Sequence, residues 1–174
     1  MKKIILTILS MLIFGLVVSA QSFGDDKSIG AWVEDKELEK DIFIRDKPSG
    51  FGKILGEIPF VMEDEDKVHI SIKGYSKGWL RIQFATKKDE TVIFSGDGWI
   101  KANRVNASVY SPKGKKVNLY ALPKLKSKKA GTIPSKAQFE VIGFDHFGLK
   151  IRYKGKTGWI PRNNICDDPF TLCS

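Results

Sequence analysis

A tripeptide that occurs twice, Gly-Trp-Ile, constrains the fold of this chain most strongly. It stands at Gly98-Trp99-Ile100 and again at Gly158-Trp159-Ile160, so that the two tryptophans lie sixty residues apart. Short β-type runs and turns, without helical periodicity, fill the interval. A period of this size is typical of a small β unit that is present twice, rather than of one large domain.

The segments around the two tripeptides align in the same order. Each unit opens with a β-type run that leads into a proline, at 42–48 and at 117–123. The further aligned segments are 56–59 with 131–134, 68–72 with 139–142, and 80–84 with 149–153. Alternation of apolar and polar residues in these segments predicts half-buried strands. We therefore predict an all-β fold made of two tandem units.

Two places distinguish the units. The first unit carries an extra hairpin near Lys87 to Phe94, followed by an expected tight turn at Gly96-Asp97-Gly98. The second unit has Gly148 where the first has Trp79. These two differences should alter, in both copies, any groove that such a unit uses.

The domain boundaries follow from composition. We expect a lead-in at 21–40, a first domain at 41–106, a linker at 107–116 and a second domain at 117–174. The linker assignment rests on a Ser-Pro-Lys-Gly turn and on low hydrophobic content.

The first twenty residues read as a cleaved signal peptide. Lys2 and Lys3 precede an apolar stretch, and the small residues Ser19 and Ala20 provide a cleavage site. The stretch is short for a membrane span. We expect an exported protein, periplasmic or secreted, with no membrane span after cleavage.

The net charge is positive. It is +9 for the whole chain and +7 without the two lysines of the signal peptide. Such a charge favours anionic partners, although solubility alone also explains it. Because the lysines are scattered over loops and the protein is exported, we expect no nucleic-acid partner.

The only two cysteines are Cys166 and Cys173. In an oxidising compartment they most simply form a disulfide that ties down the C-terminal tail. A metal site would need more ligands, and the spacing is not that of a redox-active Cys-x-x-Cys pair.

These motifs resemble the bacterial SH3-like (SH3b) family over roughly residues 40 to 165. The similarity lies in 44–49, 78–82 and 97–100 of the first unit, and in 118–123 and 155–161 of the second. The resemblance implies two tandem small SH3-like β-barrels. It also implies a non-enzymatic binding module, for peptidoglycan peptide or another cell-envelope component. An adaptor or inhibitor that binds another exported protein is the alternative.

Aromatic residues are the best candidates for a binding site. Rings at the mouth of a small barrel can form a shallow groove, with basic side chains at its rim. We expect one site at Tyr75, Trp79 and Trp99 and another at Phe144, Phe147 and Trp159. Burial of these rings in the barrel cores or between the barrels is the competing interpretation.

Catalytic residues are scarce, so we predict no enzyme, metal or cofactor. His69 falls on the outward face of a strand, and His146 on a hairpin loop beside Asp145. Neighbours on a turn rarely face each other, which argues against a general base there. The acidic run at 63–66 lacks the glycine of a calcium-binding loop and is expected to be a solvated loop tip.

Overall fold

A computed structural model describes residues 28–33, 41–59 and 67–166, and the described chain is all-β. Two short 3-10 helices interrupt the strands, η2 (Ala102–Arg104) and η3 (Arg162–Asn164). The strands are β1 (Ile29–Val33), β2 (Ile42–Arg45), β3 (Ile54–Ile58), β4 (Val68–Ser76), β5 (Trp79–Thr86), β6 (Val92–Lys101), β7 (Val105–Val109), β8 (Val117–Tyr120), β9 (Lys129–Ile133), β10 (Gln138–Asp145), β11 (Gly148–Tyr153), β12 (Lys156–Pro161) and β13 (Ile165–Cys166). The all-β expectation is confirmed.

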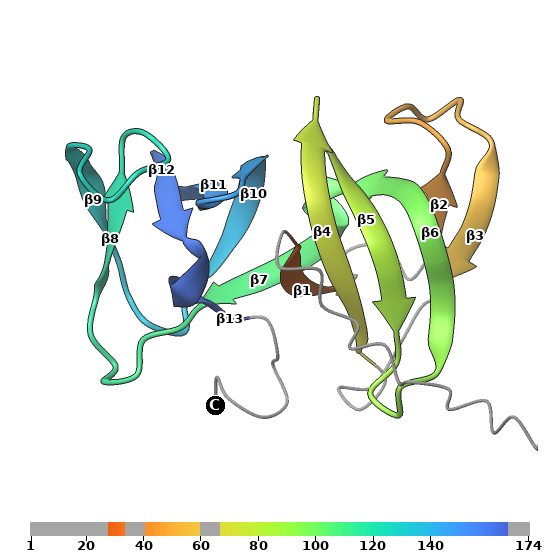
Figure 1. Cartoon of the computed structure of the whole chain (residues 1–174), viewed down its shortest axis with the longest axis horizontal. Coiled ribbons are helices and arrows are strands. Elements are labelled where there is room, and N and C mark those ends of the chain that lie inside the picture. The colour runs from red at the N-terminus through yellow and green to blue at the C-terminus, as the bar shows by residue number, and fades with distance from the viewer. Residues whose placement is uncertain (1–27, 34–40, 60–66, 167–174) are drawn as a thin grey trace, which may run out of the picture.

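The strands form one antiparallel sheet with two similar halves. Its order is β3-β2-β6-β5-β4-β1-β7-β10-β11-β12-β8-β9, and β13 pairs with β7 off this path. Figure 1 shows β2 to β6 on one side of the molecule and β8 to β12 on the other, with β1 and β7 between them. The order of β2, β6, β5 and β4 on one side matches that of β8, β12, β11 and β10 on the other.

Strand β7 is hydrogen-bonded within both halves. Its first residues pair with β1, Val105 opposite Val33, and its later residues pair with β10 and β13. β1 likewise pairs with β4 on one side and with β7 on the other. β7 is therefore the last strand of the first half, the place that β13 has in the second half. It is also the first strand of the second half, the place that β1 has in the first.

The expected linker at 107–116 begins later than composition indicated. Residues 107–109 belong to β7, and their side chains are buried. The low apolar content of 107–116 comes from residues 111–116, whereas Ala107 and Val109 are buried in the core, where β10 and β13 pair with β7.

The apolar residues of both halves pack into one continuous core. Ile70 and Ile72 from β4, and Leu149 and Ile151 from β11, are completely buried in it. Along β6 and β12 the buried residues alternate with Trp99 and Trp159, which are only partly buried. The repeated tripeptide thus places its glycine and isoleucine inward and its tryptophan on the opposite face.

The prediction of a tight turn at Gly96-Asp97-Gly98 is wrong, because all three residues lie within β6. Gly96 has a φ of +131°, and the β5–β6 register shifts between Ser95 and Gly98. A glycine in this backbone region bends the strand without ending it.

Several sequence predictions lie outside the described residues. These are the signal peptide at 1–20, the acidic run at 63–66 and the Cys173 partner of Cys166. Cys166 itself is buried at the end of β13. In the part of the chain that the structure describes, no helix has the length and apolar character needed to cross a membrane.

Candidate functional site

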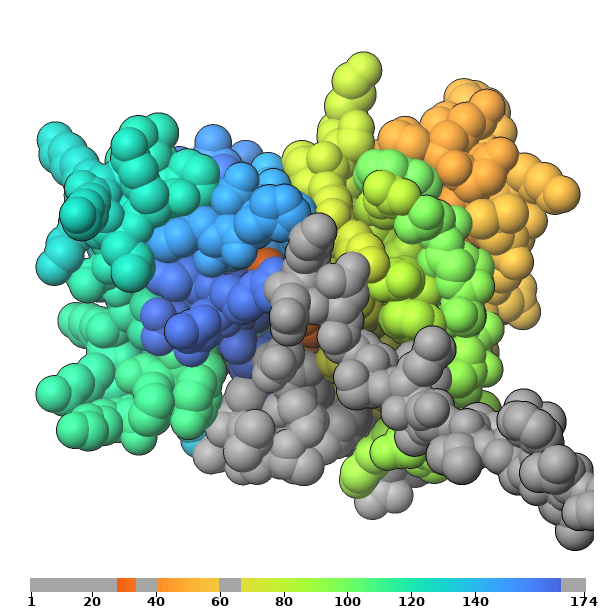
Figure 2. Space-filling model, in the orientation of Figure 1, coloured from red at the N-terminus to blue at the C-terminus, as the bar shows by residue number. Residues whose placement is uncertain are grey.

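Two equivalent hairpin loops frame the candidate sites. In the β2–β3 loop the amide of Ser49 donates to the carbonyl of Lys47, and in the β8–β9 loop the amide of Lys124 donates to that of Leu122, both at 2.7 Å. A second hydrogen bond joins the two ends of each loop. The amide of Asp46 donates to the carbonyl of Lys53 at 3.0 Å, and the amide of Ala121 donates to the carbonyl of Lys128 at 2.8 Å. Figure 2 shows the two hairpins at opposite ends of the molecule. A pocket lies beside each of them.

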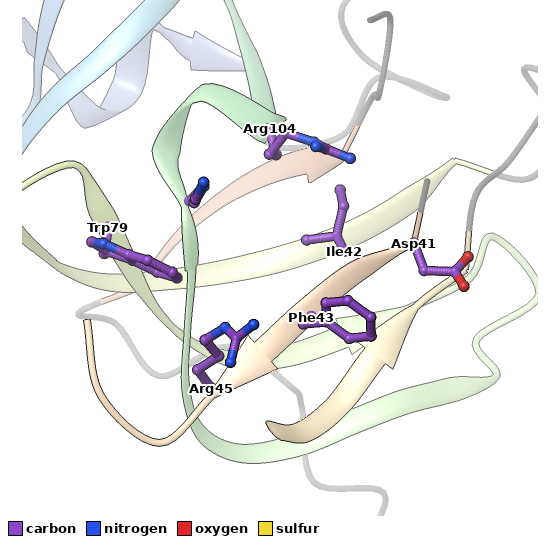
Figure 3. A pocket seen from close by; sticks show the side chains of 7 residues that line it. Asp41, Ile42, Phe43, Arg45, Trp79 and Arg104 are labelled. Carbon is purple, nitrogen blue, oxygen red and sulfur yellow. The ribbon is translucent and has the colours of Figure 1, made fainter. Parts of the chain in front are cut away.

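The first pocket lies where β2, the start of β5 and η2 meet. Its volume is about 160 Å³, and it is lined by Asp41, Ile42, Phe43, Arg45, Trp79, Lys101 and Arg104. In the view of Figure 3 the Arg45 guanidinium lies between the rings of Trp79 and Phe43. The pocket thus combines two aromatic rings with three cationic side chains and one carboxylate.

Arg45 is held in place by two contacts. Its Nη1 donates a hydrogen bond to the carbonyl of Gly52 at 2.6 Å, which anchors the β2–β3 loop to β2. Its guanidinium also lies 5.8 Å from the centroid of the Phe43 ring, a cation–π distance. Arg45 therefore shapes the pocket wall and is already partly engaged within the protein.

The second pocket lies at the equivalent place, where β8, the start of β11 and η3 meet. It is larger, about 600 Å³. Its lining is Tyr120, Pro123, Lys124, Leu125, Lys126, Phe147, Pro161, Arg162, Asn163 and Asn164. Among these residues none carries a carboxylate, whereas three are cationic.

Phe147 provides the second pocket with the ring that Trp79 provides in the first. Gly148, which aligns with Trp79, has no room for a side chain, because a Cβ there would overlap the carbonyl oxygen of Ile160. The aromatic residue instead stands one position earlier, on the β10–β11 turn. Its ring meets that of Tyr120 edge to face, with centroids 5.9 Å apart.

The backbone of Phe147 is fixed on both sides. Its amide donates to the carboxylate of Asp145 at 2.9 Å, and its carbonyl accepts from the amide of Arg162 at 2.9 Å. In the first half, the carbonyl of Gly78 accepts from the amide of Ala102 at 2.8 Å in the same way. The ring therefore sits on a turn that is tied to η3.

The predicted site residues divide into three groups. Trp79 and Phe147 each line a pocket. Tyr75 and Phe144 pack, partly buried, against the core. Trp99 and Trp159 lie on the outer sheet face, opposite Arg45 and Tyr120 respectively. Arg45 and Tyr120 line pockets, so these tryptophans adjoin the pockets without being named among their walls.

The pocket walls include residues that were not among the predicted site residues, notably Arg45, Arg104, Tyr120 and Arg162. Arg45 and Tyr120 are the last residues of β2 and β8, directly before the equivalent loops. Arg104 and Arg162 come from 3-10 turns that follow the repeated tripeptide. Arg45 and Tyr120 occupy aligned positions, so alignment of the two units could have signalled them. Arg104 and Arg162 align with Asn164 and Ala102 instead, so the repeat gave no signal for these two.

The histidines do not form a catalytic group with the residues around them. His146 is exposed and stacks edge-on near Phe144, with 6.5 Å between ring centroids. The Asp145 carboxylate instead accepts a hydrogen bond from the amide of Phe147. His69 is half-buried on β4, opposite Trp32 and Thr86. Within the described ranges, no group of three or more His, Cys, Asp or Glu residues could hold a metal.

Comparisons with known proteins give likenesses in structure only. No protein-family model and no curated protein matches the sequence. The chain is similar to NlpC2 from Trichomonas vaginalis, at 13% identity and a TM-score of 0.35, over 87% of this chain and 52% of that one. NlpC1 from the same organism is 16% identical, with a TM-score of 0.33, over 91% and 50%.

A third solved structure, the CBD of endolysin LysPBC5, is 15% identical to the chain. Its TM-score is 0.35, over 81% of this chain and 95% of that one. The chain spans about half the length of each NlpC chain. At TM-scores this low, functional inference rests on the contacts within this chain.

Proposed function

We propose that the chain is an exported, non-enzymatic binding module that recognises peptidoglycan peptide or another cell-envelope component. The supporting observation is that equivalent places in the two halves each hold a pocket with aromatic and cationic walls. We further propose that the halves are two SH3-like barrels that share β7.

The pocket chemistry suits an extended peptide. Trp79 in one pocket and Phe147 in the other offer ring surface to an apolar or sugar portion of a ligand. The basic side chains around them suit carboxylates. A few polar groups around an aromatic surface are the usual composition of a binding site for a small or extended ligand.

Retention on purified cell-wall sacculi tests this function. The mature protein should sediment with sacculi at modest salt, and Trp79→Ala should reduce its retention while leaving a cooperative melting transition. Val92→Ala is the matched control, because Val92 is an exposed apolar residue outside both pockets, 47% accessible. Absence of sedimentation, or equal retention of the Trp79 variant, would contradict the proposal.

Exposed apolar residues on the β2–β3 hairpin favour a second candidate, an adaptor that binds another exported protein. Phe51 is 96% exposed, and Ile54 and Leu55 are 48% and 42% exposed. In that case Phe51→Ser should abolish co-purification of a defined envelope protein. Trp79→Ala would leave that co-purification unchanged.

A further inference from the structure

The two pockets differ in size and charge although they occupy equivalent places. The first measures about 160 Å³ and contains the carboxylate of Asp41 among its walls. The second measures about 600 Å³, and its described walls carry Lys124, Lys126 and Arg162 with no carboxylate. A larger, more cationic pocket has both the room and the potential to hold an anionic ligand.

The floor of the second pocket is preorganised. Phe147 is held through its amide and its carbonyl, and its ring rests against Tyr120. These contacts lie within the protein itself, so they order the aromatic surface that a bound chain would use.

The basic wall of the second pocket is also held in shape. The Ser127 hydroxyl accepts a hydrogen bond from the amide of Leu122 at 3.2 Å and donates one to its carbonyl at 3.1 Å. This clamp fixes the loop that carries Lys124 and Lys126 on either side of Leu125. The loop therefore presents two exposed ammonium groups beside an exposed leucine, 64% accessible.

We propose that the second pocket is the ligand-selecting site and that it takes an extended acidic peptide. Carboxylates of the peptide would lie against Lys124 and Lys126, and its apolar atoms would rest on Phe147 and Tyr120. This inference rests on the proposed binding function and names the class of ligand. In the first pocket, Asp41 and the contacts of Arg45 with Gly52 and Phe43 disfavour the same ligand.

Fluorescence anisotropy with a labelled peptide of alternating Glu and Ala tests the assignment. The full mature chain should bind this peptide and ignore the peptide in which Gln replaces Glu. The double variant Lys124→Gln/Lys126→Gln should weaken binding about tenfold, since exposed charge pairs contribute modestly each. Phe147→Leu should also weaken binding, because leucine keeps the apolar volume but loses the ring surface.

The control is Lys113→Gln/Lys115→Gln, which removes the same charge from exposed positions of the β7–β8 connection, outside the pocket. Equal losses in the two double variants would mean that net charge alone attracts the peptide and would overturn the site. Equal binding of inorganic polyphosphate, unaffected by Phe147→Leu, would overturn it too. Retention on sacculi without binding of the acidic peptide would refute this inference and leave the proposed function standing. Binding of the acidic peptide without retention on sacculi would refute the proposed function and leave this ligand class standing.

Discussion

The ring of Phe147 meets the ring of Tyr120 edge to face, although the two residues belong to a turn and a strand far apart in the sequence. Neither residue has an aromatic counterpart at its aligned position in the first half, where Gly78 and Arg45 stand. The first half instead brings Trp79 beside Arg45. The two pockets therefore obtain an aromatic surface from different residues on the same backbone.

Gly148→Ala should lower the free energy of unfolding by about 3 kcal/mol, the upper end of what overpacking costs. The new methyl group would overlap the backbone oxygen of Ile160, which cannot turn aside as a side chain would. Gly50→Ala is the matched control, since nothing lies within 4 Å of its Cβ position. Urea denaturation of the two variants measures the difference, and equal midpoints would refute the tight β11–β12 approach.

Leu119→Ala should destabilise the protein by about 2–5 kcal/mol, because Leu119 is completely buried in the core. Leu122→Ala should change the stability by no more than about 0.5 kcal/mol, since Leu122 is 53% exposed on the neighbouring loop. Thermal melting of both variants compares them directly. A large loss in the Leu122 variant would indicate that this loop is covered.

Ala107→Leu should reduce the stability of both halves together. Ala107 is completely buried on β7, opposite Phe139, and a leucine there would overpack the strand that both halves use. Hydrogen exchange should show faster exchange in β5 and β11 alike. Ala130→Leu, at an exposed position of β9, is the control. Loss of protection in only one half would argue against a shared strand.

The hairpin tip between β5 and β6 should respond to acid. The amide and hydroxyl of Thr91 hydrogen-bond the Asp89 carboxylate, with an amide distance of 3.0 Å, and they hold its pKa below the ordinary value of 3.8. Since the pKa is lowered on folding, the turn is favoured above the unfolded pKa and loses this support as the pH falls through the folded value. NMR titration of Asp89 should show this lowered pKa, and Thr91→Val should raise it by removing the hydroxyl. A titration unchanged in that variant would exclude the hydroxyl contribution.

The sequence predicted the strands well because the repeat carries the burial pattern. Gly98 and Gly158 are buried and Ile100 and Ile160 completely so, and each Gly-Trp-Ile therefore has the same burial pattern in both halves. Whether the two tryptophans belonged to core or groove could not be predicted. Alternation along the strand puts each tryptophan on the face opposite its neighbouring glycine and isoleucine. Which of the two faces is the core, and that Arg45 and Tyr120 lie opposite the tryptophans, depends on how the strands assemble.

The candidate sites were less predictable because their walls come from loops and 3-10 turns. Lys124 and Arg162 are far apart in sequence, and only the meeting of β8 with β12 brings their segments to one pocket. The role of β7 was hidden for a similar reason. A five-residue strand with two small residues at its centre reads as the edge of a linker until its neighbours on both sides are known.

The shared strand also sets how far apart the two pockets lie. Binding sites joined by a flexible tether sample many separations, so that ligands of many lengths can bridge them. Here the halves share a hydrogen-bonded backbone through β7, which fixes the separation. For a ligand that reaches both pockets, the span becomes a selection criterion in its own right. A chain of matching length gains a high effective concentration at the second pocket, and a shorter one gains none.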